Sequence, residues 1–74
     1  MNIKIHQMKC FKEVAESGSF SAASRILGIA QPALSRKIAD LETELGKPLL
    51  MRSSRGVSLT PAGEKFLGHC RLIL

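Results

Sequence analysis

Residues 17–36 read SGSFSAASRILGIAQPALSR, and this stretch decides the fold. Ser21 is expected to cap a short helix over residues 22–27. Gly28 then supplies the permissive backbone that a tight turn needs. A second helix is predicted to begin at Gln31, with Pro32 in its first turn, where the missing N–H costs nothing. Two short helices joined by a glycine-containing turn are typical of a helix-turn-helix.

The second of these helices is predicted to run from Gln31 to Leu45. Its apolar residues recur at helical spacing and form one stripe that must face the core: Leu34, Ile38, Leu41 and Leu45. Gly46 and Pro48 follow and end the helix. Gln31, Pro32, Ser35 and Arg36 belong to its first turns, and Arg36 lies opposite the apolar stripe. That arrangement resembles a recognition helix that meets base edges in a major groove.

The charges along this predicted helix are polarised. Arg36 and Lys37 lie near its start, and its second half carries carboxylates at Asp40, Glu42 and Glu44. This order opposes the preference of the helix macrodipole, although ordinary charge balance between neighbouring turns is an alternative explanation. A helix that enters a DNA groove by its N-terminal end keeps such an acidic half outside.

Two short strand-like segments follow, Leu49–Arg52 and Val57–Thr60. The loop between them, SSRG at residues 53–56, is small and polar, which predicts a hairpin. A hairpin after a recognition helix is a wing. Arg55 lies at its tip, open to a phosphate backbone or a minor groove. Arg52 lies on the strand that leads into the tip and could instead pair with a carboxylate at the edge of the core.

Two further helices complete the predicted fold. The first spans residues 5–16 and ends before Gly18; the last begins at Pro61, with Thr60 as its cap. Apolar residues reach the end of this last helix: Phe66, Leu67, Cys70, Ile73 and Leu74. An apolar helix end of this kind is expected to continue or to pack on another chain. The fold class is therefore mainly α, a winged helix-turn-helix with a three-helix core and a β-hairpin wing over residues 1–60, followed by the start of a linker helix at 61–74.

Size and charge limit the function. A chain of 74 residues forms one domain, and a net charge of +5 suits a polyanion such as nucleic acid. No long apolar segment and no signal-peptide core are visible, so a cytoplasmic protein is expected. Cys10 and Cys70 lack metal-ligand spacing and are expected to be buried. Neither a metal nor a cofactor is expected. Several side chains are expected to be solvated: Lys4, Lys9, Lys12, Lys47, Lys65, His6 and His69.

The sequence resembles the LysR-type bacterial transcription regulators from about Met8 to Leu74. Many short matches in one order carry the resemblance: Phe11, Val14, Gly18-Ser19-Phe20, Ala22-Ala23, Leu27, Gln31-Pro32-Ala33, Ser35, Leu41-Glu42, Leu45-Gly46, Leu49, Arg52, Leu59-Thr60 and Ala62-Gly63. The resemblance implies a DNA-binding domain whose linker helix pairs two subunits, hence a homodimer on double-stranded DNA. Position 30 departs from the family, because Ala30 stands where a capping Ser or Thr is usual.

The DNA contacts that the resemblance implies fall on Gln31, Pro32, Ser35, Arg36, Arg52 and Arg55. A winged helix that binds protein instead of DNA is the alternative, but the face that carries Gln31 and Arg36 shows no apolar patch. No nucleophile with a neighbouring base and no phosphate-cradling loop is visible in the sequence, so an enzyme is not expected.

Overall fold

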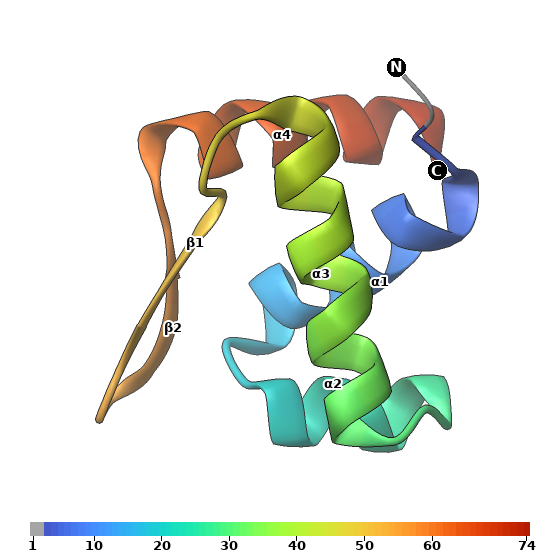
Figure 1. The fold of residues 1–74 in the computed structure, drawn as a ribbon, viewed down its shortest axis with the longest axis vertical. Helices are drawn as coiled ribbons and strands as arrows, with labels where there is room; N and C mark the ends of the chain where they lie inside the picture. The colour runs from blue at the N-terminus through green and yellow to red at the C-terminus, as the bar shows by residue number, and fades with distance from the viewer. Residues whose placement is uncertain (1–2) are drawn as a thin grey trace.

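A computed structural model of the protein describes residues 3–74. Its helices and strands follow one another in the order α1 (Ile5–Ser17), α2 (Phe20–Leu27), α3 (Gln31–Leu45), β1 (Leu50–Ser53), β2 (Gly56–Leu59) and α4 (Pro61–Ile73). Figure 1 shows α4 across one end of the molecule, α2 across the other, and α3 running between them. The predicted fold class, a mainly helical winged helix-turn-helix, is confirmed.

The core is mostly aliphatic, and every helix contributes buried residues to it. Leu34, Ile38 and Leu41 of α3 are buried, as their spacing predicted, and they pack with Phe11 and Val14 of α1. Leu45 is only half-buried at the end of the same stripe. The ring of Phe11 meets that of Phe66 edge-on at 5.4 Å between centroids, so α4 is packed onto α1.

The start of α2 differs from the prediction. The helix begins at Phe20, and its cap is Ser19, whose Oγ accepts a hydrogen bond from the Ala22 N–H at 3.1 Å. Ser21 is an exposed residue in the first turn. The difference has a clear cause: Phe20 is buried, and including it in the helix places its ring in the core.

The hairpin is shifted by one residue from the predicted boundaries. β1 and β2 pair antiparallel in a register that joins Leu50 to Leu59 and Ser53 to Gly56. The turn is therefore the two-residue segment 54–55 instead of the four-residue loop 53–56. Gly56 has a φ of +115°, a backbone conformation that other residues rarely adopt, and a Cβ there would lie 2.9 Å from the Gly18 carbonyl oxygen.

Helix α4 begins as predicted. The Thr60 Oγ1 accepts a hydrogen bond from the Gly63 N–H at 2.9 Å and donates one to the Pro48 carbonyl at 2.7 Å. A Cβ on Gly63 would collide with the Leu49 carbonyl oxygen, so only glycine lets α4 approach the strand this closely. Leu67 and Cys70 face the core, whereas Ile73 and Leu74 at the apolar end of the helix are exposed.

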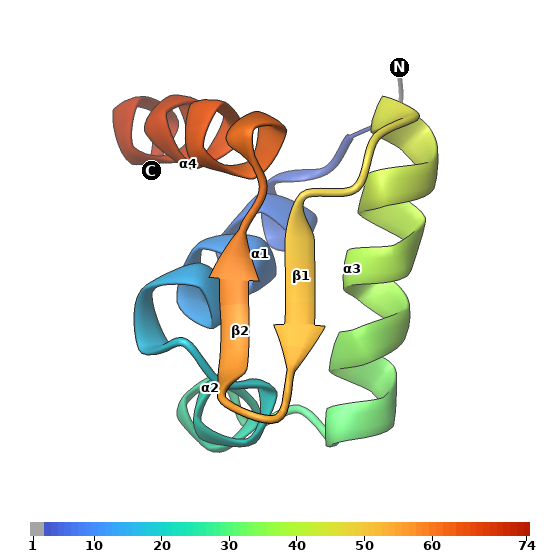
Figure 2. The same ribbon diagram turned by 90° about the vertical axis from the view of Figure 1, so that its left-hand side faces the viewer.

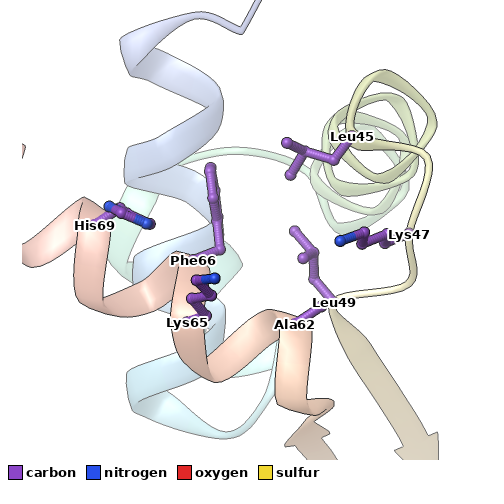
Figure 3. A pocket seen from close by; sticks show the side chains of 7 residues that line it. All are labelled: Leu45, Lys47, Leu49, Ala62, Lys65, Phe66 and His69. Atoms are coloured by element: carbon purple, nitrogen blue, oxygen red, sulfur yellow. The ribbon is translucent and has the colours of Figure 1, made fainter.

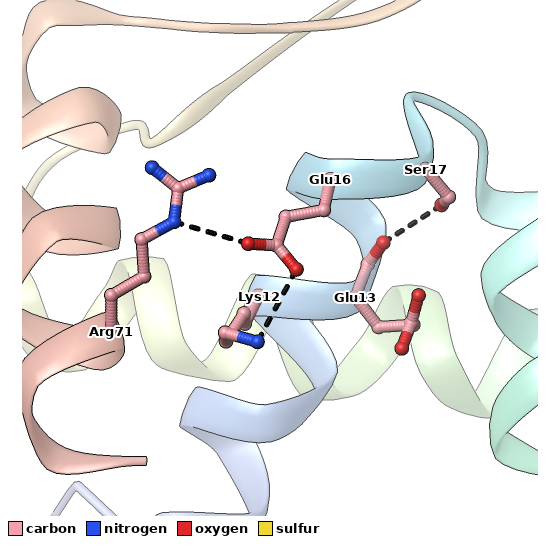
Figure 4. A network of polar contacts seen from close by, with 5 residues as sticks. All are labelled: Lys12, Glu13, Glu16, Ser17 and Arg71. Atoms are coloured by element: carbon pink, nitrogen blue, oxygen red, sulfur yellow. Dashed lines mark hydrogen bonds and ion pairs between the residues drawn. The ribbon is translucent and has the colours of Figure 1, made fainter.

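A polar network joins α1 to α4. Glu16 of α1 accepts from the Arg71 Nε of α4 at 3.1 Å and pairs with the Lys12 Nζ at 3.3 Å (Figure 4).

Cys10 and Cys70 are fully buried, as expected, and burial raises the pKa of both thiols. None of the helices described over residues 3–74 is long and apolar enough to cross a membrane.

Candidate nucleic-acid interface

The N-terminal end of α3, helix α2 and the turn of the hairpin lie at the same end of the molecule. Figures 1 and 2 agree on this arrangement, with α4 at the opposite end. The predicted contact residues of α3 and of the hairpin therefore belong to one surface. From here on, the N-terminal half of α3 together with the wing, hairpin β1–β2, is called the basic end.

Helix α3 presents two different faces at the basic end. Leu34 and Ile38 point into the core, whereas Gln31, Pro32 and Arg36 are exposed and Ser35 is half-buried. Within residues 3–74, the side-chain amide of Gln31 has no hydrogen-bond partner. Its donor and acceptor are therefore both available to an external group.

Arg36 is a highly exposed charged group on this face. Its side chain keeps 79% of its accessible surface, and its Nε lies 3.3 Å from the Asp40 Oδ1 one turn later. Such an exposed pair contributes little to stability. The guanidinium is thus held loosely, with most of its N–H donors free.

Arg52 is held by two neighbours instead of a carboxylate. Its guanidinium carbon lies 3.9 Å from the centroid of the Phe20 ring, and its Nη2 donates to the Ser35 Oγ at 2.6 Å. The possible pairing with a carboxylate at the core edge is not what the structure shows. Through this one side chain, the wing contacts both α2 and α3. The stacking distance is that of a cation–π interaction.

Arg55 occupies the turn of the wing, and its position is fixed by the backbone. Its N–H donates to the Ser53 Oγ at 3.2 Å, while its side chain is exposed. Next to the turn, the Val57 N–H donates to the Gly18 carbonyl at 3.2 Å. This bond joins the wing to the loop between α1 and α2. It therefore restrains the turn that carries Arg55.

The base of the wing is anchored to α3 by Glu42. One carboxylate oxygen, Oε2, accepts from the Leu49 N–H at 2.7 Å and from the Leu50 N–H at 3.2 Å. A carboxylate that accepts two backbone N–H bonds forms a strong link. Glu42 therefore has a structural role that explains at least one of the acids in the second half of this helix.

Sequence reasoning missed a polar hollow beside the basic end. A hollow between α2 and the wing is lined by Ser19, Ser21, Gln31, Arg52 and Ser53, among others. Ser21 was expected only as a helix cap, and Ser19 only as part of the family resemblance. Polar residues directly before a helix were the available signal, because free backbone N–H groups at a helix start attract anions.

The chain matches known proteins along most of its length. The family described as "Bacterial regulatory helix-turn-helix protein, lysR family" matches residues 5–64. The chain is 46% identical over 72 residues to the HTH-type transcriptional regulator AlsR of Bacillus subtilis, covering 97% of this chain and 24% of that protein. It is 48% identical to BudR of Raoultella terrigena, covering 96% and 25%. The chain thus spans about a quarter of the length of these curated relatives.

Solved structures give the same match. The structure titled as a complex of BenM_DBD with catB site 1 DNA superposes with a TM-score of 0.93 at 42% identity, covering 96% of this chain and 79% of that one. A CbnR_DBD–DNA complex superposes with a TM-score of 0.92 at 44% identity, covering 96% and 82%.

Proposed function

The chain belongs to the lysR family of bacterial regulatory helix-turn-helix proteins, and we propose that it is the sequence-specific DNA-binding domain of a transcription regulator. In this proposal the N-terminal end of α3 enters the major groove, and the wing lies on the phosphate backbone or in the minor groove. Relatives that share over 40% identity are named transcriptional regulators, and two similar structures are complexes with DNA. A binding role in the bacterial cytoplasm, and no catalysis, follows from this assignment.

One observation carries the proposal: the N-terminal end of α3 and the wing turn lie at one end of a domain with a net charge of +5, and Gln31, Arg36 and Arg55 of these segments are exposed. Gln31 has both groups that a bidentate contact to adenine needs, and Arg36 has those for guanine or phosphate. Pro32 offers apolar contact to a thymine methyl. Ser35 keeps its hydroxyl proton for a base or phosphate while its oxygen accepts from Arg52.

The two wing arginines are proposed to act differently. Arg55 reaches outward from the turn to a phosphate or into the minor groove. Arg52 keeps the wing against α3 and still has N–H donors that can meet the DNA backbone. We also propose the division of the chain into a winged helix-turn-helix over residues 1–60 and the start of a linker helix over 61–74, with a homodimer formed through that helix.

Selection of bound sequences from a random DNA pool tests this function. We expect enrichment of a short inverted repeat, since two copies related by a two-fold axis read two equal half-sites. Gln31→Ala should relax the preference at one position of each half-site while the flanking preferences remain. A pool that shows no enrichment with the wild-type chain would contradict sequence-specific binding and would favour a winged helix that binds protein.

A further inference from the structure

A second surface hollow lies away from the basic end, between the C-terminal end of α3, the loop to β1 and the first turns of α4. Figure 3 shows the side chains of Leu45, Leu49 and Phe66 converging on it. Leu49 is buried and Phe66 is held by its edge-on contact with Phe11, so the floor is apolar and fixed in place. The volume, about 300 Å³, is at the lower end for ligand pockets.

The rim of this hollow is basic. Lys47 comes from the loop on one side, and Lys65 and His69 come from α4 on the other. No acidic residue lines the hollow. Within residues 3–74, neither lysine ammonium lies within ion-pair distance of a carboxylate. Two unpaired cations beside an apolar floor specify the chemistry of a binding partner, because charged surfaces bind complementary ones.

We propose that this hollow, the α3–α4 groove, docks an acidic segment of a partner protein. One bulky apolar side chain of the segment fills the space over Leu49 and Phe66, and flanking carboxylates meet Lys47 and Lys65. The rim charges come from two separate elements, so a segment with several carboxylates matches them better than a small molecule with one. An apolar floor without hydrogen-bond donors suits a leucine or phenylalanine side chain and offers nothing to a nucleotide.

The position of the groove makes this role compatible with DNA binding. The C-terminal end of α3 and the start of α4 lie at the end of the molecule opposite α2 and the wing turn (Figure 1). A partner seated there leaves the basic end open. The inference does not depend on the proposed DNA contacts, so either can fail while the other stands.

The test uses the 74-residue chain and a displayed library of random 12-residue peptides. We expect the selected peptides to combine one large apolar residue with two or more acids. A synthetic peptide of the selected sequence should shift the backbone amide NMR signals of Lys47, Lys65, Phe66 and His69. Replacing its apolar residue by alanine should abolish these shifts.

Charge variants then locate the contact. Lys47→Glu and Lys65→Glu should each weaken the peptide about three- to tenfold, as expected for reversal of an exposed charge. Lys9→Glu, with the same charge change on an exposed residue of α1, is the matched control and should leave peptide affinity unchanged. Equal losses in all variants would show only a response to net charge and would overturn the proposal.

Other occupants give different results. Selected peptides without acids, or signal changes elsewhere on the domain, would contradict a groove for acidic segments. If the amide of Lys47, which lies outside α4, also shifts with protein concentration in the absence of peptide, a second copy of the chain is the occupant of the groove and the proposal is wrong. Displacement of the peptide by duplex DNA would likewise assign the groove to nucleic acid.

Discussion

The Nη2 of Arg52 donates a 2.6 Å hydrogen bond to the Oγ of Ser35, so the wing is joined to α3 at the surface proposed to meet DNA. The same guanidinium stacks on the Phe20 ring of α2. Because one planar group makes both contacts, a lysine cannot replace it even though it keeps the charge. Arg52 is therefore a positioning residue for the wing in addition to any contact that it makes itself.

Arg52→Lys should lower the free energy of unfolding by about 1 kcal/mol, from the lost stacking and hydrogen bond together. It should also weaken DNA binding, because the wing is no longer fixed. Denaturant unfolding and fluorescence anisotropy measure the two effects. Arg55→Lys is the control, since Arg55 lies on the same hairpin with an exposed side chain, and it should leave stability unchanged. An Arg52→Lys protein as stable as wild type would show that only the charge matters.

Asp40 is expected to weaken DNA binding. Its carboxylate lies 3.3 Å from the Arg36 guanidinium and places a negative charge next to the proposed contact face. Asp40→Asn should free Arg36 and raise DNA affinity about two- to fivefold, the range of one exposed ion pair. Glu64→Gln makes the same charge change at the start of α4 and serves as control. Equal gains in DNA affinity from both variants would show that the effect comes from net charge alone.

Helix α3 lacks the hydroxyl cap that α2 and α4 possess. Ser19 accepts from the Ala22 N–H, and Thr60 from the Gly63 N–H, each three residues on, whereas Ala30 offers no oxygen to Ala33. Ala30 is exposed, with a φ of −59° and a ψ of 140°, so a hydroxyl has room there. Ala30→Ser should stabilise the domain by about 1 kcal/mol in thermal or denaturant unfolding. A loss of stability would mean that the hydroxyl does not reach the Ala33 N–H.

Most of the helical structure was predictable because local sequence signals indicate where the helices begin and end. A helix was predicted from about Gln31 to Leu45, and α3 has these bounds, since Pro32 at the start and Gly46 after the end are strong local signals. The start of α2 was wrong because Ser19 and Ser21 are both good caps. Only the burial of Phe20 decides between them, and burial depends on the other helices.

The site was predictable only in part. Residues of α3 share a face by helical periodicity, so Gln31 and Arg36 could be grouped from sequence. The contact of Arg52 with Ser35 joins positions 17 residues apart on different elements, and no local pattern contains it. The α3–α4 groove was missed for the same reason: Lys47 and Lys65 looked like ordinary solvated lysines until the fold placed them around one apolar floor.

Glu16 should make stability depend on acid pH. Hydrogen bonds from Arg71, and then from Lys12, hold the pKa of its carboxyl below the ordinary value of 4.5. A carboxyl with a lowered folded-state pKa stabilises the protein above its unfolded pKa, and this contribution is lost as the pH falls through the folded value. Glu16→Gln should therefore lower the Tm near neutral pH, and the difference from wild type should disappear in acid. Glu13→Gln, three residues earlier on α1, is the control; a Tm difference that persists in acid would contradict the ion-pair origin.

The exposed end of α4 is expected to form the contact between two copies of the chain. Leu72 keeps 86% of its accessible surface and Ile73 keeps 59%, although both are large and apolar. Burying such side chains against the same helix of a second copy removes them from water, which favours association. A two-fold dimer places two α3 helices on the same face of the DNA, one helical turn or a multiple apart.

Analytical ultracentrifugation with a palindromic duplex measures this assembly. We expect two copies of the chain per duplex, and Leu72→Glu together with Ile73→Glu should reduce the cooperativity of the second copy while the affinity for a single half-site is kept. Because both residues are exposed, the substitutions leave the buried Leu67 and Cys70 contacts intact and the fold should survive, which circular dichroism checks. The decisive observation is stoichiometry: one copy per inverted-repeat duplex at saturating protein would exclude the dimer.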